Sequence, residues 1–349
     1  MKGVALVCYT LFFCVILKIV INYEREKYNM KRKINIANFN LTYGDNDEPM
    51  LSHFDDILYP ALISNIKKES FNRTGITTSY FLMDIKIENN KNNNYILTGL
   101  IVKDTILEIK SQMNGDNLVD TDYTYKSAPY SYFCINLINH RMYLVKNQSG
   151  SPDLRLFKST VEFILREYVN KRNQELNDEK DLLPVPFVEV LGIPYYAKIQ
   201  EELQKVEKIQ SLTLNFFPLN GDTDFSEAFK SVSDIRINID SKNGSVKYNN
   251  PKNIEKVGEL LKETNGTVDP KVRVKYKNSA RTATIEGSQL TEQITVELTD
   301  SEEGIKEYNN IQQISNSMEK SETLNNIKGN HIKIYDKYKN KIISILNKK

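Results

Sequence analysis

Residues 130–145 read YSYFCINLINHRMYLV, and they set the expected fold class. Two runs rich in aromatic and aliphatic residues, Tyr130–Ile138 and Arg141–Val145, flank the short polar connection Ile138–Arg141. This pattern predicts two antiparallel strands joined by a tight hairpin. We therefore expect an antiparallel sheet at the centre of the first half of the chain.

Further strand-like runs lie upstream of this hairpin. Residues 34–39, INIANF, alternate apolar and polar side chains as a half-buried strand does. Three more runs follow at Thr77–Glu88, Tyr95–Val102 and Thr105–Ser111, separated by Asn-, Gly- and Asp-rich gaps. Together with the hairpin they predict an antiparallel meander.

Two amphipathic helices are expected to accompany the meander. Apolar residues recur at helical spacing in Phe54–Lys68 and again in Pro152–Gln174, where Ser151-Pro152-Asp153 provides a favourable start. These elements define an N-terminal α+β domain over residues 30–175. Residues 176–190 turn to charge and proline, which is typical of a linker.

The second half alternates helices and strands more evenly. Helices are predicted at Tyr195–Ile209, Phe225–Val232 and Pro251–Lys262, and strands at Ser211–Phe217, Asp234–Ile239, Lys271–Tyr276, Arg281–Glu286 and Gln293–Leu298. This order predicts a C-terminal α/β sandwich over residues 191–300, with helices on one face of its sheet. Residues 301–349 are first polar and then form a basic helical tail. The whole chain is thus expected to be α+β.

A hydrophobic segment opens the chain within residues 1–29. Residues 4–21, VALVCYTLFFCVILKIVI, are apolar except for Lys18 and about long enough to cross a bilayer. Basic residues follow, so an inserted segment would leave the main domain facing the cytoplasm. Two alternatives are a mis-assigned start, with Met30 as the true one, and a signal peptide, which the lack of a small-residue cleavage site disfavours. The expected location is cytoplasmic or membrane-anchored, with a membrane as partner only if residues 4–21 are an anchor.

The bulk composition is that of an ordinary globular protein. The 349 residues include 40% hydrophobic and 26% charged side chains, and 47 basic against 45 acidic residues give a net charge of +2. The net charge is therefore too small to attract nucleic acid or an acidic substrate by itself. The abundance of Asn, Lys, Ile and Tyr without Trp is typical of a low-GC bacterial genome, and three scattered cysteines give no disulfide framework.

Familiar catalytic signatures are missing from the sequence. It contains no glycine-rich nucleotide loop, no HExxH, no GxSxG and no paired CxxC. Its three histidines, His53, His140 and His331, fall at a helix entry, a hairpin turn and the basic tail, which indicates turn or surface positions. A binding protein without a cofactor is therefore favoured over an enzyme.

One enzymatic alternative is a metal-dependent nuclease. Glu108 and Lys110 are two residues apart in a strand and so share a face, with Asp84 on an upstream strand. Mg²⁺ held there would activate water for phosphodiester hydrolysis. Such a pair also arises by chance, as the solvated face of a strand whose apolar residues Leu107 and Ile109 are buried behind it.

The strongest functional pattern is the strand at residues 271–277, KVRVKYK. Its odd positions are all basic and its even positions all apolar, which predicts a row of cations on one side of a sheet. The row consists of Lys271, Arg273, Lys275 and Lys277, with Arg281 shortly after. Phosphates bind such rows by counterion release. The alternative is an edge strand protected from aggregation by its lysines.

The C-terminal tail adds lysines interleaved with tyrosines. The candidate nucleic-acid contacts are Lys333, Lys337, Lys339 and Lys341. With Tyr335 and Tyr338 between them, stacking and charge together would grip a single strand. The same tail could instead form a helix that docks on the protein or lies on an anionic membrane.

A pattern in the second half gives a loose resemblance. Residues 212–222, LTLNFFPLNGD, followed by a helix, a strand and VRVKY, resemble the second half of uncharacterised bacterial families found among phage-defence and mobile-element genes. The resemblance implies a cytosolic protein that acts on foreign nucleic acid with a partner protein from the same gene cluster.

The expected function is that of a non-enzymatic accessory protein. It would bind DNA or RNA through the basic strand and the tail. The alternatives are the metal-dependent nuclease, which alone would need Mg²⁺, and a structural protein that binds a partner chain.

Overall fold

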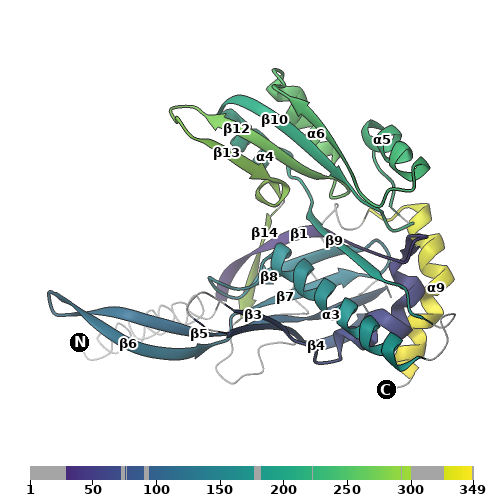
Figure 1. Cartoon of the computed structure of the whole chain (residues 1–349), viewed down its shortest axis with the longest axis horizontal. Helices are drawn as coiled ribbons and strands as arrows, with labels where there is room; N and C mark the ends of the chain where they lie inside the picture. The colour runs from purple at the N-terminus through teal and green to yellow at the C-terminus, as the bar shows by residue number, and fades with distance from the viewer. Residues whose placement is uncertain are drawn as a thin grey trace, which may run out of the picture.

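Two antiparallel sheets organise the chain in the computed structural model (Figure 1). The structure describes residues 29–71, 75, 77–89, 94–176, 182–221, 223–291, 293–299 and 326–347. The larger sheet has ten strands and the smaller has four, and helices accompany both. The predicted α+β class is confirmed.

The larger sheet follows the order β14-β1-β8-β7-β5-β4-β3, with β2 and β9 also paired to β1 and β6 paired to β5. Its strands are β1 (Asn29–Tyr43), β2 (Glu48–Pro49), β3 (Lys68–Phe71), β4 (Thr77–Asn89), β5 (Tyr95–Asn114), β6 (Asn117–Ser127), β7 (Tyr130–Asn136), β8 (Arg141–Lys146), β9 (Pro186–Gly192) and β14 (Gln293–Thr299). The first part of β1 pairs with β14, its middle with β8 and its last part with β9. One long strand therefore joins segments from distant parts of the chain.

The predicted meander forms, with one extension. β7 and β8 pair as the expected hairpin, whose turn holds His140 at a φ of +54°. The two runs predicted at Tyr95–Val102 and Thr105–Ser111 are a single strand, β5. Its first part lies between β4 and β7, whereas its second part pairs with β6, which was not predicted. This β5–β6 hairpin extends away from the rest of the molecule (Figure 1).

Helical segments supply the rest of the larger core. α3 (Leu154–Glu175) forms where it was predicted, and the Asp153 carboxylate caps it by accepting a hydrogen bond from the Leu156 N–H at 2.9 Å. The helix predicted over Phe54–Lys68 is shorter. Helical structure begins earlier, at Met50, and ends at Leu62, before β3. It consists of the 3-10 helix η1 (Met50–His53), the π-helical segment η2 (Phe54–Leu58) and the short α-helix α2 (Tyr59–Leu62).

Two segments join the larger sheet against expectation. Residues 186–190 were predicted as linker, but they belong to β9, where Val188 and Val190 are buried. The strand at Gln293–Leu298 was assigned to the C-terminal sandwich, but β14 pairs with β1. Neither prediction could use the pairing partner, because β1 lies more than 140 residues upstream in the sequence.

The smaller sheet follows the order β11-β10-β12-β13. Its elements are α4 (Tyr196–Gln204), β10 (Val206–Phe216), α5 (Glu227–Asn238), β11 (Gly244–Asn249), α6 (Ile254–Glu263), β12 (Asp269–Tyr276), β13 (Thr282–Glu286) and the short turn η4 (Gly287–Leu290). Apolar side chains of α4 and α6 pack with those of β10 and β12 in one core. The helices therefore cover one face of this sheet, as predicted.

The strand predicted at Asp234–Ile239 is wrong. α5 continues through this segment, because Phe229, Ser233 and Arg236 are buried at helical spacing. The isoleucines that suggested strand alternation are 54–70% exposed instead. The predicted helix at Tyr195–Ile209 also ends early, and β10 begins at Val206.

The C-terminal tail docks on the larger core as helix α9 (Gly329–Asn347). Tyr335 and Ile342 are buried there, and the Tyr335 hydroxyl accepts a hydrogen bond from the Tyr95 N–H at 3.4 Å. Lys341 forms an ion pair with Asp55 at 2.9 Å. The docking-helix interpretation of the tail is therefore the one that the structure supports.

No helix within the described residues is long and apolar enough to span a membrane. The hydrophobic segment at residues 4–21 lies outside the described residues.

A half-buried histidine gives the fold a pH dependence. The His53 ring lies 2.9 Å from the Asp56 carboxylate and 3.0 Å from that of Glu48. Burial lowers the His53 pKa, but the hydrogen bonds and charges of the two carboxylates outweigh it and raise the pKa above 6.5.

A pKa that is higher in the folded state means that protonated His53 stabilises the fold. We expect this stabilisation to be complete below pH 6.5, the ordinary histidine pKa, and to disappear as the pH rises through the folded-state pKa of His53. In thermal melts from pH 6 to pH 9, the difference in melting temperature between wild type and His53→Gln should narrow as the pH rises. A difference that is constant or widens would contradict the assignment.

Candidate nucleic-acid interface

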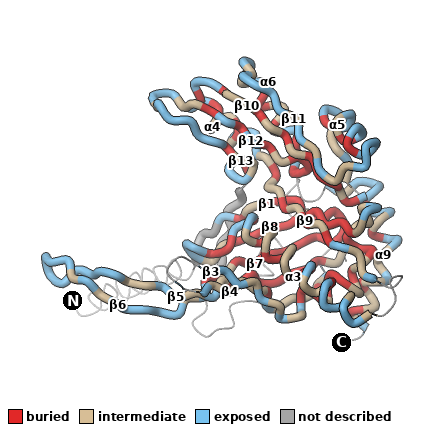
Figure 2. Tube along the Cα trace, viewed as in Figure 1, coloured by how far each residue is buried: buried red, intermediate tan, exposed pale blue. Residues whose placement is uncertain are grey.

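The basic row of β12 lies on the face of the smaller sheet opposite α4 and α6. The start of α3 borders the Lys271 end of this face, where Arg155 forms an ion pair with Glu286. Val272 and Val274 are fully buried against the helix-covered side. Since successive side chains of a strand point to opposite faces, Lys271, Arg273 and Lys275 lie on the other side. Lys271 and Arg273 are exposed and Lys275 is partly exposed, and Figure 2 shows this alternation of buried and exposed positions along the strand. We call this surface the open face.

Neighbouring strands bring two further lysines to the open face. Lys208 of β10 lies directly opposite Lys275. Thr213 of β10 lies opposite both Lys271 on one side and Lys247 of β11 on the other. Directly paired residues share a face, so five cations from three strands lie on it. Neither Lys208 nor Lys247 was recognised from the sequence.

Carboxylates balance part of this charge. Glu207 pairs with Lys275 at 2.9 Å, and Asp269 lies 3.9 Å from Lys271. Glu286 is opposite Lys271 but forms its ion pair with Arg155 of α3. No described carboxylate comes within ion-pair distance of Arg273, so its charge stays available at the centre of the open face.

The row is not explained by edge protection. β12 lies between β10 and β13, and the edge strands of the smaller sheet are β11 and β13. Lysines that protect a sheet from aggregation are needed on the edges. The edge-strand alternative for residues 271–277 is therefore wrong.

Two other predicted residues lie beside the row. The Lys277 ammonium donates a hydrogen bond to the Gln204 carbonyl at 2.9 Å, at the C-terminal end of α4. This interaction ties it to the helix end. Arg281 is exposed in the turn between β12 and β13.

The tail lysines belong to a separate surface. α9 lies beside the larger sheet, away from β12 and β13 (Figure 1). Its exposed side carries Lys333 and Lys337, whereas Lys339 is partly buried and Lys341 pairs with Asp55. Tyr335 is 4% exposed, so it cannot serve as a stacking platform. The structure therefore does not bring the tail and the basic strand together.

The three nuclease candidates are also separated. Glu108 and Lys110 do share a face, with 3.5 Å between the Lys110 ammonium and the Glu108 carboxylate. Asp84 lies in a bulge of β4 opposite Gly99, nine residues before Glu108 along β5. Nine residues of extended strand span about 30 Å. Across the described part of the chain, no three His, Cys, Asp or Glu side chains converge on a metal position.

The histidines differ from expectation in burial. His140 lies in a turn as predicted, but it is 1% exposed, and its ring lies 3.0 Å from the Asn220 amide. His331 is likewise buried at the start of α9. Their roles in the described structure are packing and hydrogen bonding within the protein.

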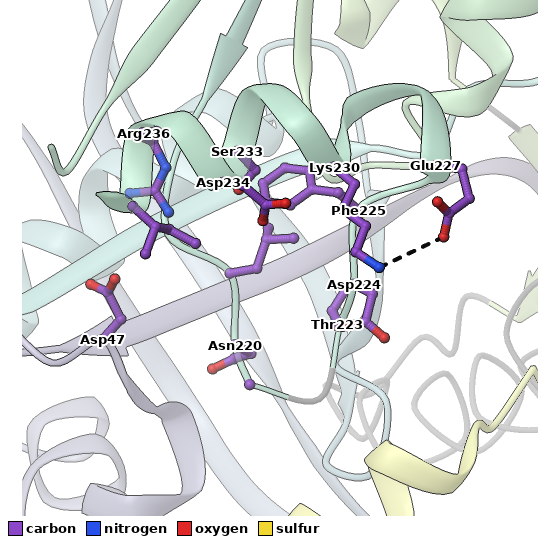
Figure 3. Close-up of a pocket in the computed structure, with 13 residues that line it drawn as sticks. Asp47, Asn220, Thr223, Asp224, Phe225, Glu227, Lys230, Ser233, Asp234 and Arg236 are labelled. Carbon is purple, nitrogen blue, oxygen red and sulfur yellow. Dashed lines mark ion pairs between the residues drawn. The ribbon is translucent and has the colours of Figure 1, made fainter. Parts of the chain in front are cut away.

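A polar cavity of about 460 Å³ lies beside α5 (Figure 3). Four carboxylates line it, from Asp47, Asp224, Glu227 and Asp234, against the cations Lys230 and Arg236. Arg236 is buried, which lowers its pKa, and its guanidinium donates to the Ser241 carbonyl at 2.6 Å and the Lys242 carbonyl at 3.1 Å. Arg236 therefore satisfies backbone carbonyls just beyond the C-terminal end of α5. The acidic lining of the cavity disfavours a phosphate ligand.

The chain matches no known protein-family model, and neither a curated protein nor a solved structure matches it significantly. The interpretation of the open face therefore depends on its own geometry.

Proposed function

We propose that the open face binds the sugar-phosphate backbone of nucleic acid, without catalysis. The observation that supports this is a set of five cations from three adjacent strands on the sheet face opposite α4 and α6: Lys208, Lys247, Lys271, Arg273 and Lys275. The resemblance of residues 212–222 agrees with an accessory role on foreign nucleic acid beside a partner protein.

The residue types between the cations favour backbone contact over base recognition. Alternate residues of β12 are about 6.7 Å apart, comparable to the spacing of successive phosphates in an extended strand. Ser211, Thr213 and Thr284 lie opposite the cations and can donate hydrogen bonds to phosphate oxygens. No aromatic side chain of the described strands is paired with the cations on this face, so base stacking is not expected. Binding should be independent of sequence.

A salt titration of the full chain tests the proposal. If all five cations contact phosphates, log K should fall with log salt at a slope of about −4.5 for duplex DNA or about −3.5 for a single strand. Between 50 and 200 mM salt the affinity would then drop by roughly 500-fold for duplex DNA and roughly 100-fold for a single strand. Fluorescence anisotropy with labelled oligonucleotides of unrelated sequence measures this. Absence of binding at 50 mM salt, or a slope near zero, would contradict it.

A further inference from the structure

The β5–β6 hairpin beyond Lys103 is unusual in having both faces exposed. β6 pairs with β5 alone among the described strands, and no residue of the hairpin belongs to any of the three described hydrophobic clusters (Figure 1). Most of its length is exposed in Figure 2. A two-stranded ribbon without a packing partner is marginally stable in water. A second surface packed against the hairpin would therefore stabilise it.

Its two faces differ in chemistry. Directly opposite residues share a face, and one face carries the pairs Leu107–Tyr125, Ile109–Tyr123 and Met113–Leu118. We call this the apolar hairpin face. Asp120, opposite Ser111, is its single charged residue.

The other face of the hairpin is mainly polar. It carries the pairs Ile106–Lys126 and Glu108–Thr124, together with the ion pair between Glu108 and Lys110. Charge is thus concentrated on the side that faces away from the apolar pairs. The sequence expectation that Leu107 is buried behind Glu108 is wrong, because both sides are open to solvent.

The apolar hairpin face is large enough to form a protein interaction site. Leu107 is 54% exposed, Tyr123 and Tyr125 are 53%, Met113 is 64% and Leu118 is 70%. With Ile109 these side chains offer roughly 600 Å² per chain, a patch size that marks interaction sites on soluble proteins.

We propose that a second copy of this chain covers the apolar hairpin face. Two such faces would bury roughly 1,200 Å² together, which reaches the lower limit of a specific interface. The contact is self-complementary, since apolar side chains meet apolar side chains and the charged faces remain in water. Sheets pack face to face in this way at a separation of about 10 Å. Because the hairpin extends away from the rest of the molecule, two copies can pair about a two-fold axis through their hairpins without a clash between the remaining parts.

The test is the oligomeric state of the full chain in a mild detergent. Light scattering coupled to size exclusion should show a dimer for wild type and a monomer for the double variant Leu107→Glu, Tyr125→Glu, with the dimer dissociation constant raised at least 100-fold. The matched control is Ile106→Glu with Thr124→Glu, which adds the same two charges to the other face of the same hairpin. It should remain dimeric. Circular dichroism melts check that both variants stay folded.

Three results would overturn the proposal. They are a monomeric wild type at about 100 µM, dissociation of the control to the same extent, or a dimer that survives the apolar-face changes. A monomeric wild type that floats with phosphatidylcholine vesicles through Leu107 would identify a lipid surface as the occupant instead. The contact does not use the open face, so nucleic-acid binding can be present or absent in either case.

Discussion

Replacing Arg273 and Lys275 by glutamate should weaken nucleic-acid binding at least tenfold at about 100 mM salt and make the salt slope shallower by about two. Arg273 lies at the centre of the open face with no described carboxylate within ion-pair distance, and Lys275 lies two residues away on the same strand. Each substitution removes a phosphate contact and adds repulsion. Arg273 is exposed, and Lys275 is partly exposed in a surface ion pair with Glu207, so the free energy of unfolding should fall by no more than about 1 kcal/mol.

A matched pair of substitutions separates this effect from net charge. Lys230→Glu with Lys256→Glu changes the total charge by the same amount on α5 and α6, and both lysines are exposed. These variants should lose little affinity, because their lysines do not lie on the open face. Equal losses in the two pairs would show that binding follows total charge and would contradict the assignment of this surface.

The basic row was predictable because its signal is local. Strict alternation from Lys271 to Lys275 fixes which side chains share a face, whichever strand lies next to it. Lys208 and Lys247 join the same surface only through the pairing of β10 with β12 and β11. Those pairings link residues far apart in the sequence, so a complete site could not be drawn from the pattern of one strand.

Errors in the fold have similar causes. Asp234–Ile239 alternates like a strand, yet the burial of Arg236 at helical spacing from Phe229 keeps it in α5. β6 did leave a signal, since Gly115-Asp116 suits a two-residue hairpin turn with glycine at its first position, and Gly115 adopts a φ of +61°. The sequence gives no local signal that β9 and β14 belong to the larger sheet, because their pairing depends on the length of the distant strand β1.

A buried polar cluster joins the smaller sheet's connecting loop to the larger sheet. Asn220 is 2% exposed, and its side-chain oxygen accepts a hydrogen bond from the Met50 N–H at 2.9 Å. Its amide nitrogen lies 3.0 Å from the His140 ring, and its backbone N–H donates to the Asn40 side chain at 2.7 Å. Asn40 in turn donates to the Pro218 carbonyl at 2.7 Å. Three other segments of the chain therefore contact Asn220, two through its side-chain amide and one through its backbone N–H.

Asn220→Leu should lower the free energy of unfolding by about 3 kcal/mol. The substitution preserves approximate volume but leaves the Met50 N–H and the His140 ring without the Asn220 side chain. A buried polar group that loses its partner costs about 1–3 kcal/mol. Urea denaturation of the full chain, followed by circular dichroism, measures the change.

Asn249→Leu is the control, because Asn249 is exposed at the end of β11 and its replacement should change stability by no more than about 0.5 kcal/mol. Asn40→Leu should be destabilising as well, and the double variant with Asn220→Leu should lose less than the sum of the two, since both residues belong to one hydrogen-bonded cluster. A loss below about 1 kcal/mol for Asn220→Leu, or strict additivity with Asn40→Leu, would mean that apolar packing alone holds the loop against the larger sheet. The expected non-additive loss would instead show that Asn40 and Asn220 act as one hydrogen-bonded unit, which holds the loop that follows β10 against β1.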